Sequence, residues 1–416
     1  MAKVMIWPDI YKEHGHWLPT IHLAKKLQGE SHDVEFMGIP DTESIVAPYH
    51  ATFNTILADI YPLGHSVENR LEPKHQRWKP HHLLPIARGD LGELFEGAGK
   101  ADLLISGYFT ALETLILHRK YGVPFVFTTT FLRNPAEDPL THAMTKLVHM
   151  PAAVAQRLIS ETTGGSHMSL EEFVAPLDDF PELIPCPRVF DFDDEERGEH
   201  RATVHYVEPM IERDLLGPGD PPADPIGELP EGKRLIFGTA GSQVQDYEGL
   251  ARQYFVSLVQ MMQTAGMGDY HLVLAVGDRL MSYFTEYFKI GSSSTTLPKN
   301  VSMYSWVSQL DIMEKAEAIF MHGGLATIKE SVWEEVPIII MPHGKDQMDN
   351  AMRIRRKGIG VVSRAQDLSP TELRKLFTQA TASRWIKKNL AKMRAVFEQQ
   401  ETEAPSLAVI QGVLAP

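Results

Sequence analysis

Three groups of residues in the C-terminal half of the chain could bind a nucleotide sugar. Trp306, Val307 and Gln309 come first, the turn His322 to Thr327 (HGGLAT) second, and the pair Asp346-Gln347 third. A tryptophan ring can stack on a base, and a glycine turn before a helix can bind phosphate through free N–H groups. Adjacent carboxylate and amide groups suit sugar hydroxyls, which both donate and accept hydrogen bonds.

Each group alone has a simpler interpretation. Thr327 could cap a helix with Glu330 as its capping box, Asp346 could cap the next helix, and Trp306 could be a core residue. The three groups nevertheless span only forty-two residues, and each follows a predicted strand. Their order along the chain favours one extended ligand over three unrelated structural roles.

Apolar runs and amphipathic segments alternate in both halves of the chain, which is typical of α/β domains of the doubly wound kind. Strands are predicted at 3–8, 32–39, 101–109, 123–130, 234–242, 270–277, 300–306, 317–322, 337–342 and 359–362, with a helix at 18–29 and another at 139–159. The Pro-rich, acidic segment 177–200 is predicted to be a loop. Ligands of such sheets bind at the carboxyl ends of the strands, where the polar groups lie.

The domain organisation follows from a segment rich in proline and glycine. Residues 215–233 contain five prolines and four glycines and are predicted to be a linker. Residues 1–214 then form an N-terminal domain and residues 234–395 a C-terminal domain, which contains the three groups described above. Residues 396–416 are predicted to be a tail that returns to the N-terminal domain.

The composition restricts the class of protein. The 416 residues are 43% hydrophobic and 23% charged, and a net charge of −14 argues against a nucleic-acid partner. The single cysteine, Cys186, allows no intrachain disulfide and fits a reducing compartment. No apolar run is long enough for a membrane span. We therefore expect a cytoplasmic protein, either a monomer or a homodimer.

From Val301 to Val362 the chain resembles the donor-binding signature of UDP-dependent glycosyltransferases of the GT-B fold, family GT1. The matching motifs are W-V-x-Q at Trp306, H-G-G-x-x-T at His322, Glu330, and D-Q-x-x-N at Asp346. This family includes bacterial enzymes of macrolide, antibiotic and other natural-product biosynthesis. The resemblance implies two Rossmann-like domains facing across a cleft, with residues 1–214 binding the acceptor and residues 234–395 binding the donor.

The resemblance also implies roles for these residues. Trp306 would stack on uracil, Gln309 would contact base or ribose, and Glu330 would bind ribose hydroxyls. Asp346 and Gln347 would bind the sugar. No metal ion would be needed. The nucleotide, UDP or dTDP, would be part of the co-substrate rather than a bound cofactor. The diphosphate would be held by His322, Gly324, Ala326 and Thr327, and the remaining residues near the donor would be Val307, Thr239 and Ser242.

A G-H-x-x-P element near the N-terminus matches the place where this family carries its catalytic histidine. Gly15, His16 and Pro19 fit the element, so His16 is the predicted general base, with His14 as a nearby rival. Attack by the acceptor oxygen with UDP leaving from the opposite side would invert the anomeric carbon.

The chain departs from the family at the partner of this histidine. Many members carry an aspartate about 100 residues further on, but here that place falls at Gly107 or Tyr108, and Asp102 is expected at the wrong end of its strand. Asp9 and Glu13 are alternative partners that the sequence does not rank. An acidic phenol as acceptor would also reduce the need for a strong base.

The predicted function is therefore an inverting, metal-independent transfer of a hexose from UDP-glucose or a dTDP-sugar to a hydroxyl of a small lipophilic acceptor. Two alternatives are a sugar-nucleotide epimerase of GT-B fold and a non-catalytic nucleotide-sugar-binding homologue.

Overall fold

A computed structural model describes residues 1–66, 80–213, 227, 229–241, 244–288, 296–363 and 368–415. The chain divides into two compact units. Unit 1 comprises Met1–Arg188, Phe192–Glu212 and Glu403–Pro416, and unit 2 comprises Val189–Asp191 and Arg213–Thr402. Most of the predicted linker lies outside the described residues.

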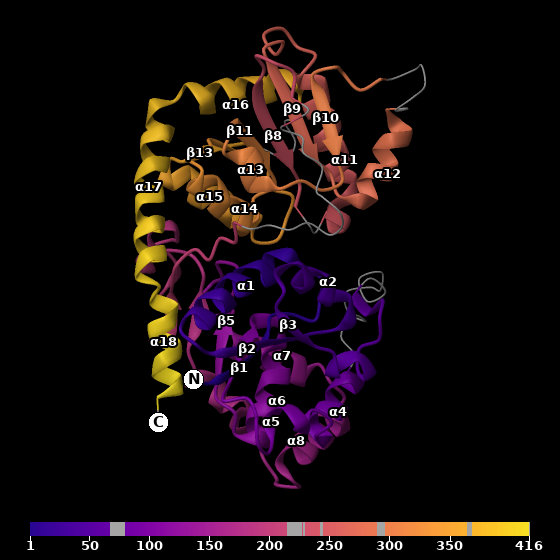
Figure 1. Ribbon diagram of the computed structural model, residues 1–416, viewed down its shortest axis with the longest axis vertical. Coiled ribbons are helices and arrows are strands. Elements are labelled where there is room, and N and C mark those ends of the chain that lie inside the picture. The colour runs from indigo at the N-terminus through magenta and orange to yellow at the C-terminus, as the bar shows by residue number, and fades with distance from the viewer. Residues whose placement is uncertain are drawn as a thin grey trace. The chain divides into compact units, whose positions relative to one another are not determined.

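Unit 1 is built on a seven-stranded parallel sheet with the order β3-β2-β1-β4-β5-β6-β7 (Figure 1). Its strands are β1 Lys3–Trp7, β2 Asp33–Met37, β3 Thr52–Asn54, β4 Leu103–Gly107, β5 Phe125–Thr128, β6 Glu182–Ile184 and β7 Val204–Tyr206. Every residue of β4 is buried, as expected for a central strand with both faces covered.

Helices cover both faces of this sheet. They are α1 His14–Gly29, α2 Glu43–Val46, α4 Leu83–Arg88, α5 Gly92–Phe95, α6 Ala111–Tyr121, α7 Pro139–Val148, α8 Ala152–Thr163, α9 Leu170–Val174, α10 Asp194–Arg197 and α18 Pro405–Leu414. Met5 and Trp7 of β1 belong to the core on one face, and Val4 and Ile6 belong to the core on the other. Ile410 of α18 is fully buried in the second core, so the C-terminal segment is part of unit 1.

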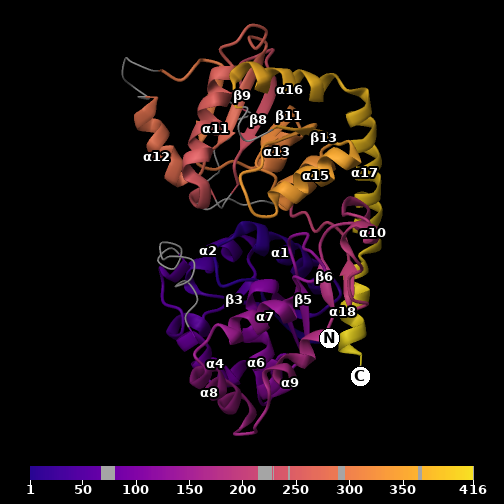
Figure 2. The ribbon, with the colours of Figure 1, turned by 180° about the vertical axis from the view of Figure 1, so that it is seen from behind.

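Unit 2 repeats the plan with six parallel strands in the order β10-β9-β8-β11-β12-β13. The strands are β8 Arg234–Thr239, β9 Tyr270–Ala275, β10 Val301–Tyr304, β11 Ala316–Met321, β12 Ile338–Ile340 and β13 Gly360–Val362. The helices are α11 Glu248–Met261, α12 Asp278–Tyr287, α13 Gln309–Met313, α14 Leu325–Trp333, α15 Gln347–Lys357, α16 Pro370–Ala382 and α17 Arg384–Glu403. Helices α11 and α16, both labelled in Figure 2, pack together. Helices α13 and α14 also pack together.

Both sheets have a topological switch point, where the chain order reverses between neighbouring strands. It lies between β1 and β4 in unit 1 and between β8 and β11 in unit 2. Loops that leave the carboxyl ends of these strands diverge to opposite faces and leave room for a ligand. The segments after β1 and β4, and after β8 and β11, are therefore the positions to inspect.

Three predicted elements differ from the structure. Helix α1 ends at Gly29 as predicted but begins at His14 instead of residue 18, and it contains Pro19 as its sixth residue. The predicted helix 139–159 is two helices, α7 and α8, separated at Pro151, which cannot continue a helix. The predicted loop 177–200 contains the buried strand β6 and helix α10, which are too short to show a period.

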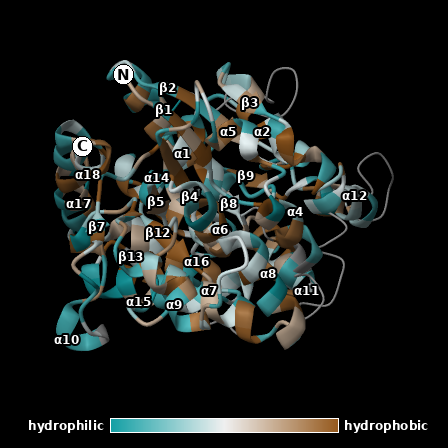
Figure 3. Ribbon diagram, turned by 90° about the horizontal axis from the view of Figure 1, so that it is seen from below, coloured by the Kyte–Doolittle hydropathy of each residue, from teal (hydrophilic) through white to brown (hydrophobic). Residues whose placement is uncertain are grey.

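Hydrophobic residues concentrate on the central strands, whereas α10 and α17 are largely hydrophilic (Figure 3). Across the described ranges, no helix combines the length and apolar character needed to cross a membrane.

Candidate functional site

The switch point of unit 2 is built around His322. This histidine directly follows β11 and is 7% exposed. Gly324 adjoins its ring so closely that an added Cβ would lie 2.7 Å from His322 Nε2. A Cβ at Gly241, after β8, would overlap the same ring, and Gly241 has a φ of 74°. The structure thus brings the two predicted turns together, with glycines where the imidazole needs space.

Helix α14 begins at this turn, with Gly324 at the N-cap and no side-chain cap bond. Thr327 is the third residue of the helix and is buried, so the interpretation of Thr327 as N-cap is wrong. The N–H groups of the first turn and the positive end of the helix dipole are therefore open to an anion. Ala326, also in this turn, is half-buried.

Three buried polar atoms near these turns have no hydrogen-bond partner within the described part of the chain. They are Gln309 Oε1, His322 Nδ1 and Glu330 Oε2. Burial raises the pKa of Glu330 to about 7, against a smaller opposing effect of Lys329. Burial, with smaller effects of His343 and Lys345, lowers the pKa of His322 to about 3, so its imidazole is neutral. Unpaired buried groups are costly, and a ligand would satisfy them.

The other predicted base and phosphate contacts lie around this core. Trp306 is half-buried in the loop between β10 and α13, and no aromatic ring within the described ranges stacks on it. Val307 is buried beside it. Thr239 is buried, and its hydroxyl accepts a hydrogen bond from the N–H of Gly241 at 3.3 Å. Ser242 lies outside the described residues.

The predicted sugar-binding pair is partly engaged within unit 2 itself. Gln347 Oε1 accepts from the N–H of His343 at 2.7 Å and of Gly344 at 3.2 Å, and Gln347 Nε2 donates to Tyr247 Oη at 2.9 Å. Asp346 sits at the N-cap of α15 but makes no cap bond; its Oδ2 accepts from Asn350 Nδ2 at 3.0 Å. Burial raises the pKa of Asp346. Sugar binding by the pair stays a prediction.

His343 is a site residue that the sequence did not single out. Its ring stacks on Tyr247 with centroids 5.2 Å apart, and its Nδ1 is buried without a partner in the described ranges. Burial lowers the pKa of His343 to about 4. Its position two residues beyond Met341, at the carboxyl end of β12, is the signal that could have found it.

The switch point of unit 1 contains a histidine and an aspartate in contact. His16 Nδ1 lies 2.5 Å from Asp9 Oδ2. Asp9 is fully buried, and its Oδ1 accepts from the N–H groups of Ile10 at 2.7 Å and Tyr11 at 3.2 Å. On the other side, the His16 ring stacks on Phe109, 5.4 Å away. Of the alternatives left open by the sequence, Asp9 makes the contact to Nδ1.

Of the two places where the family's aspartate could fall, Tyr108 carries a phenol and Gly107 has no room for a side chain. A Cβ at Gly107, the last residue of β4, would overlap the carbonyl oxygen of Pro8. Asp102 precedes β4, at the opposite end, where it accepts from the N–H of Lys3 at 2.8 Å. The rival base His14 has its pKa lowered to about 4, first by burial and then by Lys12.

The family model "UDP-glucoronosyl and UDP-glucosyl transferase" matches residues 277–411. This segment comprises 135 of the 416 residues. The predicted resemblance is confirmed over that segment, which contains the motifs from Trp306 to Gln347. A stretch of 121 residues is 29% identical to UDP-glucuronosyltransferase 1A8 of Rattus norvegicus and 28% identical to 1A9 of Mus musculus. The match covers 29% of this chain and 23% of each relative's length.

Solved structures match the whole chain. The glycosyltransferase of kitacinnamycin is 18% identical with a TM-score of 0.72, covering 100% of this chain and 99% of that one. The calicheamicin glycosyltransferase CalG4 is 19% identical with a TM-score of 0.68 and full coverage of both chains. VinC in complex with dTDP is 17% identical with a TM-score of 0.64 over 99% of both. These structures confirm the predicted GT-B fold.

The described residues contain no group of three or more histidine, cysteine, aspartate or glutamate residues placed to hold a metal ion.

Proposed function

We propose that this protein transfers a hexose from a UDP- or dTDP-linked sugar to a hydroxyl of a small lipophilic acceptor, with inversion at the anomeric carbon. The observation that carries the proposal is the set of unpaired buried atoms of Gln309, His322 and Glu330. They lie in the segment that matches the UDP-glycosyltransferase family. A nucleotide sugar supplies hydroxyls and phosphate oxygens that would pair with them.

The donor half of the reaction uses fixed dipoles. The leaving diphosphate would accept hydrogen bonds from the first turn of α14 and from the neutral imidazole of His322, which keeps an N–H to donate. Negative charge that builds up on the leaving oxygen is stabilised by the helix N-terminus. In this proposal the helix and the histidine perform the charge stabilisation that a divalent cation would otherwise provide.

The acceptor half uses His16 as general base. Asp9 would hold the proton on Nδ1, which leaves the Nε2 lone pair free to take the proton of the acceptor hydroxyl. The acceptor oxygen forms a bond to the anomeric carbon as the bond from that carbon to the diphosphate oxygen breaks. Asp9 is a positioning residue, because it acts through His16.

The contact between Asp9 and His16 also argues against the non-catalytic alternative. That alternative was prompted by the missing aspartate after β4, and Asp9 supplies a carboxylate from β1 instead. An epimerase needs no acceptor hydroxyl, so acceptor dependence separates it from a transferase.

The test is product analysis by mass spectrometry after incubation with UDP-glucose or a dTDP-sugar and a set of phenols and macrolides. We expect a glycosylated acceptor and one nucleoside diphosphate released per transfer. Release of a changed sugar nucleotide without acceptor would support the epimerase. Nucleotide binding without turnover across the set would refute transfer.

A further inference from the structure

A three-residue segment from the first half of the chain belongs to unit 2. Val189–Asp191 groups with unit 2, although the chain on both sides of it groups with unit 1. Asp191 Oδ1 accepts a hydrogen bond from Arg353 Nε, in α15, at 2.8 Å. Their side chains are 6% and 3% exposed, so this ion pair is shielded from water. A buried ion pair adds little net stability after desolvation, so stability alone does not account for it.

The guanidinium of Arg353 also determines how the amide of Asn350 is turned. Arg353 Nη1 donates to Asn350 Oδ1 at 2.9 Å. Because an arginine can only donate, the amide oxygen of Asn350 must take this side and its NH₂ group the other. There, Asn350 Nδ2 donates to the carbonyl oxygen of Gly323 at 2.9 Å and to Asp346 Oδ2 at 3.0 Å. Asn350 is fully buried, and both ends of its amide are engaged.

The Asn350 amide therefore connects two parts of the candidate donor site. Gly323 lies in the turn that is predicted to hold the diphosphate, and Asp346 belongs to the pair that is predicted to bind the sugar. Burial raises the pKa of Asp346, whereas the hydrogen bond from Asn350 and the positive charge of Arg353 act in the opposite direction. Both favour the ionised carboxylate, which can only accept hydrogen bonds and so suits the hydroxyls of a sugar.

We propose that Asp191 and Arg353 are positioning residues for the donor sugar: they orient the Asn350 amide, which holds the Asp346 carboxylate in place. The inference rests on the proposed function, since it requires a sugar at Asp346. Asp191 lies 162 residues before Arg353 and outside the segment that matches the family model. The donor site would thus depend on a residue that its sequence motifs do not contain.

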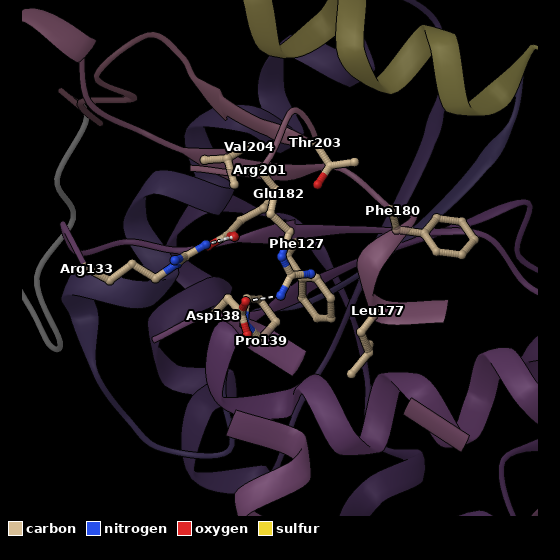
Figure 4. Close-up of a pocket in the computed structure, with 10 residues that line it drawn as sticks. All are labelled: Phe127, Arg133, Asp138, Pro139, Leu177, Phe180, Glu182, Arg201, Thr203 and Val204. Carbon is tan, nitrogen blue, oxygen red and sulfur yellow. Dashed lines mark hydrogen bonds and ion pairs between the residues drawn. The ribbon is translucent and has the colours of Figure 1, made fainter. Parts of the chain in front are cut away.

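A buried ion pair in unit 1 provides a matched control. Glu182 Oε1 accepts from Arg133 Nε at 2.8 Å, and the two side chains are 5% and 1% exposed. Figure 4 shows this pair, together with the pair of Asp138 and Arg201, around a small cavity of unit 1. Glu182→Ala and Asp191→Ala each take a carboxylate from a buried arginine, so both should lower stability. Asp191 connects to the donor residues through Arg353, whereas Glu182 belongs to unit 1.

The test measures, by calorimetry on the full chain, the affinities for UDP and UDP-glucose, or for dTDP and dTDP-glucose if the parent protein binds these more tightly. The ratio of the nucleotide-sugar affinity to the nucleotide affinity reports on the sugar contacts, because the two ligands share the nucleotide. We expect Asp191→Ala to lower this ratio by roughly 2- to 12-fold, the range for one hydrogen bond. Glu182→Ala should leave the ratio unchanged. Thermal unfolding records the stability of each variant.

A double-mutant cycle shows whether Asp191 acts through Asp346. In Asp346→Asn the carboxylate to be positioned is already absent, so adding Asp191→Ala should change the ratio by less than about twofold. A second variant, Asp191→Leu with Arg353→Met, replaces both partners of the ion pair and leaves neither charge buried alone, a change that proteins often tolerate. It should lower the ratio as Asp191→Ala does, and it carries the test if Asp191→Ala does not fold.

An unchanged ratio in the Asp191 variants would overturn the inference. Equal losses with and without Asp346→Asn, or an equal loss in Glu182→Ala, would also overturn it. Failure of the proposed function gives a different result. If the parent protein binds neither nucleotide sugar, or if Asp346→Asn leaves the ratio unchanged, then sugar binding at Asp346 is wrong and the inference falls with it. If Asp346→Asn lowers the ratio but the Asp191 variants do not, then only the positioning role is wrong.

Discussion

The two switch points occupy the same place in two sheets of the same order, yet they carry different chemistry. In unit 2, glycines surround a neutral histidine and leave buried polar atoms unpaired. In unit 1, a histidine stacks on Phe109, and its Nδ1 already has a carboxylate partner. The unpaired atoms of unit 2 suit a polar ligand, whereas the paired histidine of unit 1 suits proton transfer. In the proposed function, one fold therefore supports binding in one unit and acid–base chemistry in the other.

The largest expected effect comes from removing the histidine at the switch point of unit 1. His16→Ala removes the proposed base, and transfer should fall by roughly 10²- to 10⁴-fold, the usual contribution of general base catalysis. Steady-state kcat with a saturating acceptor is the measurement. His14→Ala is the matched control, since His14 is the rival base and should cost much less. A larger loss in His14→Ala would transfer the role to that residue.

The next effect comes from Asp9→Asn. Asp9 Oδ1 accepts two backbone N–H groups, so the amide oxygen must take that side and the NH₂ must face His16. The imidazole then accepts at Nδ1 and carries its proton on Nε2, the wrong tautomer for a base. We expect kcat to fall by roughly 10- to 10²-fold with donor KM unchanged.

Nitrogen NMR of His16 should report the tautomer change in Asp9→Asn. Asp102→Asn is the control, because Asp102 accepts a backbone N–H at the opposite end of β4. An unchanged tautomer together with normal kcat would show that Asp9 has no positioning role.

Glu330→Gln tests the unit 2 side. The folded pKa of Glu330 is about 7, above the ordinary value, so the folded protein holds this proton more tightly than the unfolded chain does. Stability therefore falls as pH rises toward 7 and stays lowered above it. The Gln variant should be more stable than the parent at pH 8 by roughly 1–3 kcal/mol and nearly equal at pH 4.5. Urea unfolding at both pH values measures this.

The same variant should bind UDP up to about tenfold more weakly, because a hydrogen bond to a carboxylate becomes a weaker bond to a neutral amide oxygen. Glu314→Gln, at an exposed position, should change neither property. A pH-independent stability difference would contradict the burial argument for Glu330.

The smallest effect concerns the loop that carries Gln347. Tyr247→Phe removes the hydroxyl that accepts from Gln347 Nε2 and should raise the donor KM by about threefold, roughly the worth of one neutral hydrogen bond. UDP alone should bind almost unchanged, since the loop is proposed to contact the sugar. Tyr270→Phe is the control, because Tyr270 is the first residue of β9, at the opposite end of the strand from the proposed site, where its hydroxyl accepts from Arg234. If Tyr247→Phe weakened the binding of UDP and of the UDP-sugar equally, the loop would not contact the sugar.

The donor motifs could be located from the sequence because they are nearly contiguous, from Trp306 to Gln347. The carboxylate partner of His16 could not, because the family's usual aspartate follows β4, where the Pro8 carbonyl leaves no room beside Gly107. Only the folded turn after β1 shows Asp9 reaching the imidazole. The hydrogen bond from the Gln347 amide to Tyr247 could not be predicted from the sequence either, since the two residues are 100 positions apart in the chain.

Secondary-structure elements were likewise predictable where the sequence pattern that marks them is local. All six strands of unit 2 were predicted correctly from their apolar runs. Strand β6 has three residues and draws its hydrogen bonds from distant strands β5 and β7, so no local pattern marks it. The charged residue Glu182 at its start further disguised it as loop.

The central claim is that unit 2 binds the donor nucleotide while unit 1 activates the acceptor. Calorimetric titration of UDP and dTDP into His322→Ala, His16→Ala and the parent protein tests it most directly. We predict that His322→Ala weakens binding of the preferred nucleotide by roughly 10- to 150-fold, the loss of one charged hydrogen bond. His16→Ala should leave that affinity within about twofold, since it contributes no donor contact in this account. Unchanged affinity in His322→Ala, or an equal loss in both variants, would contradict the account.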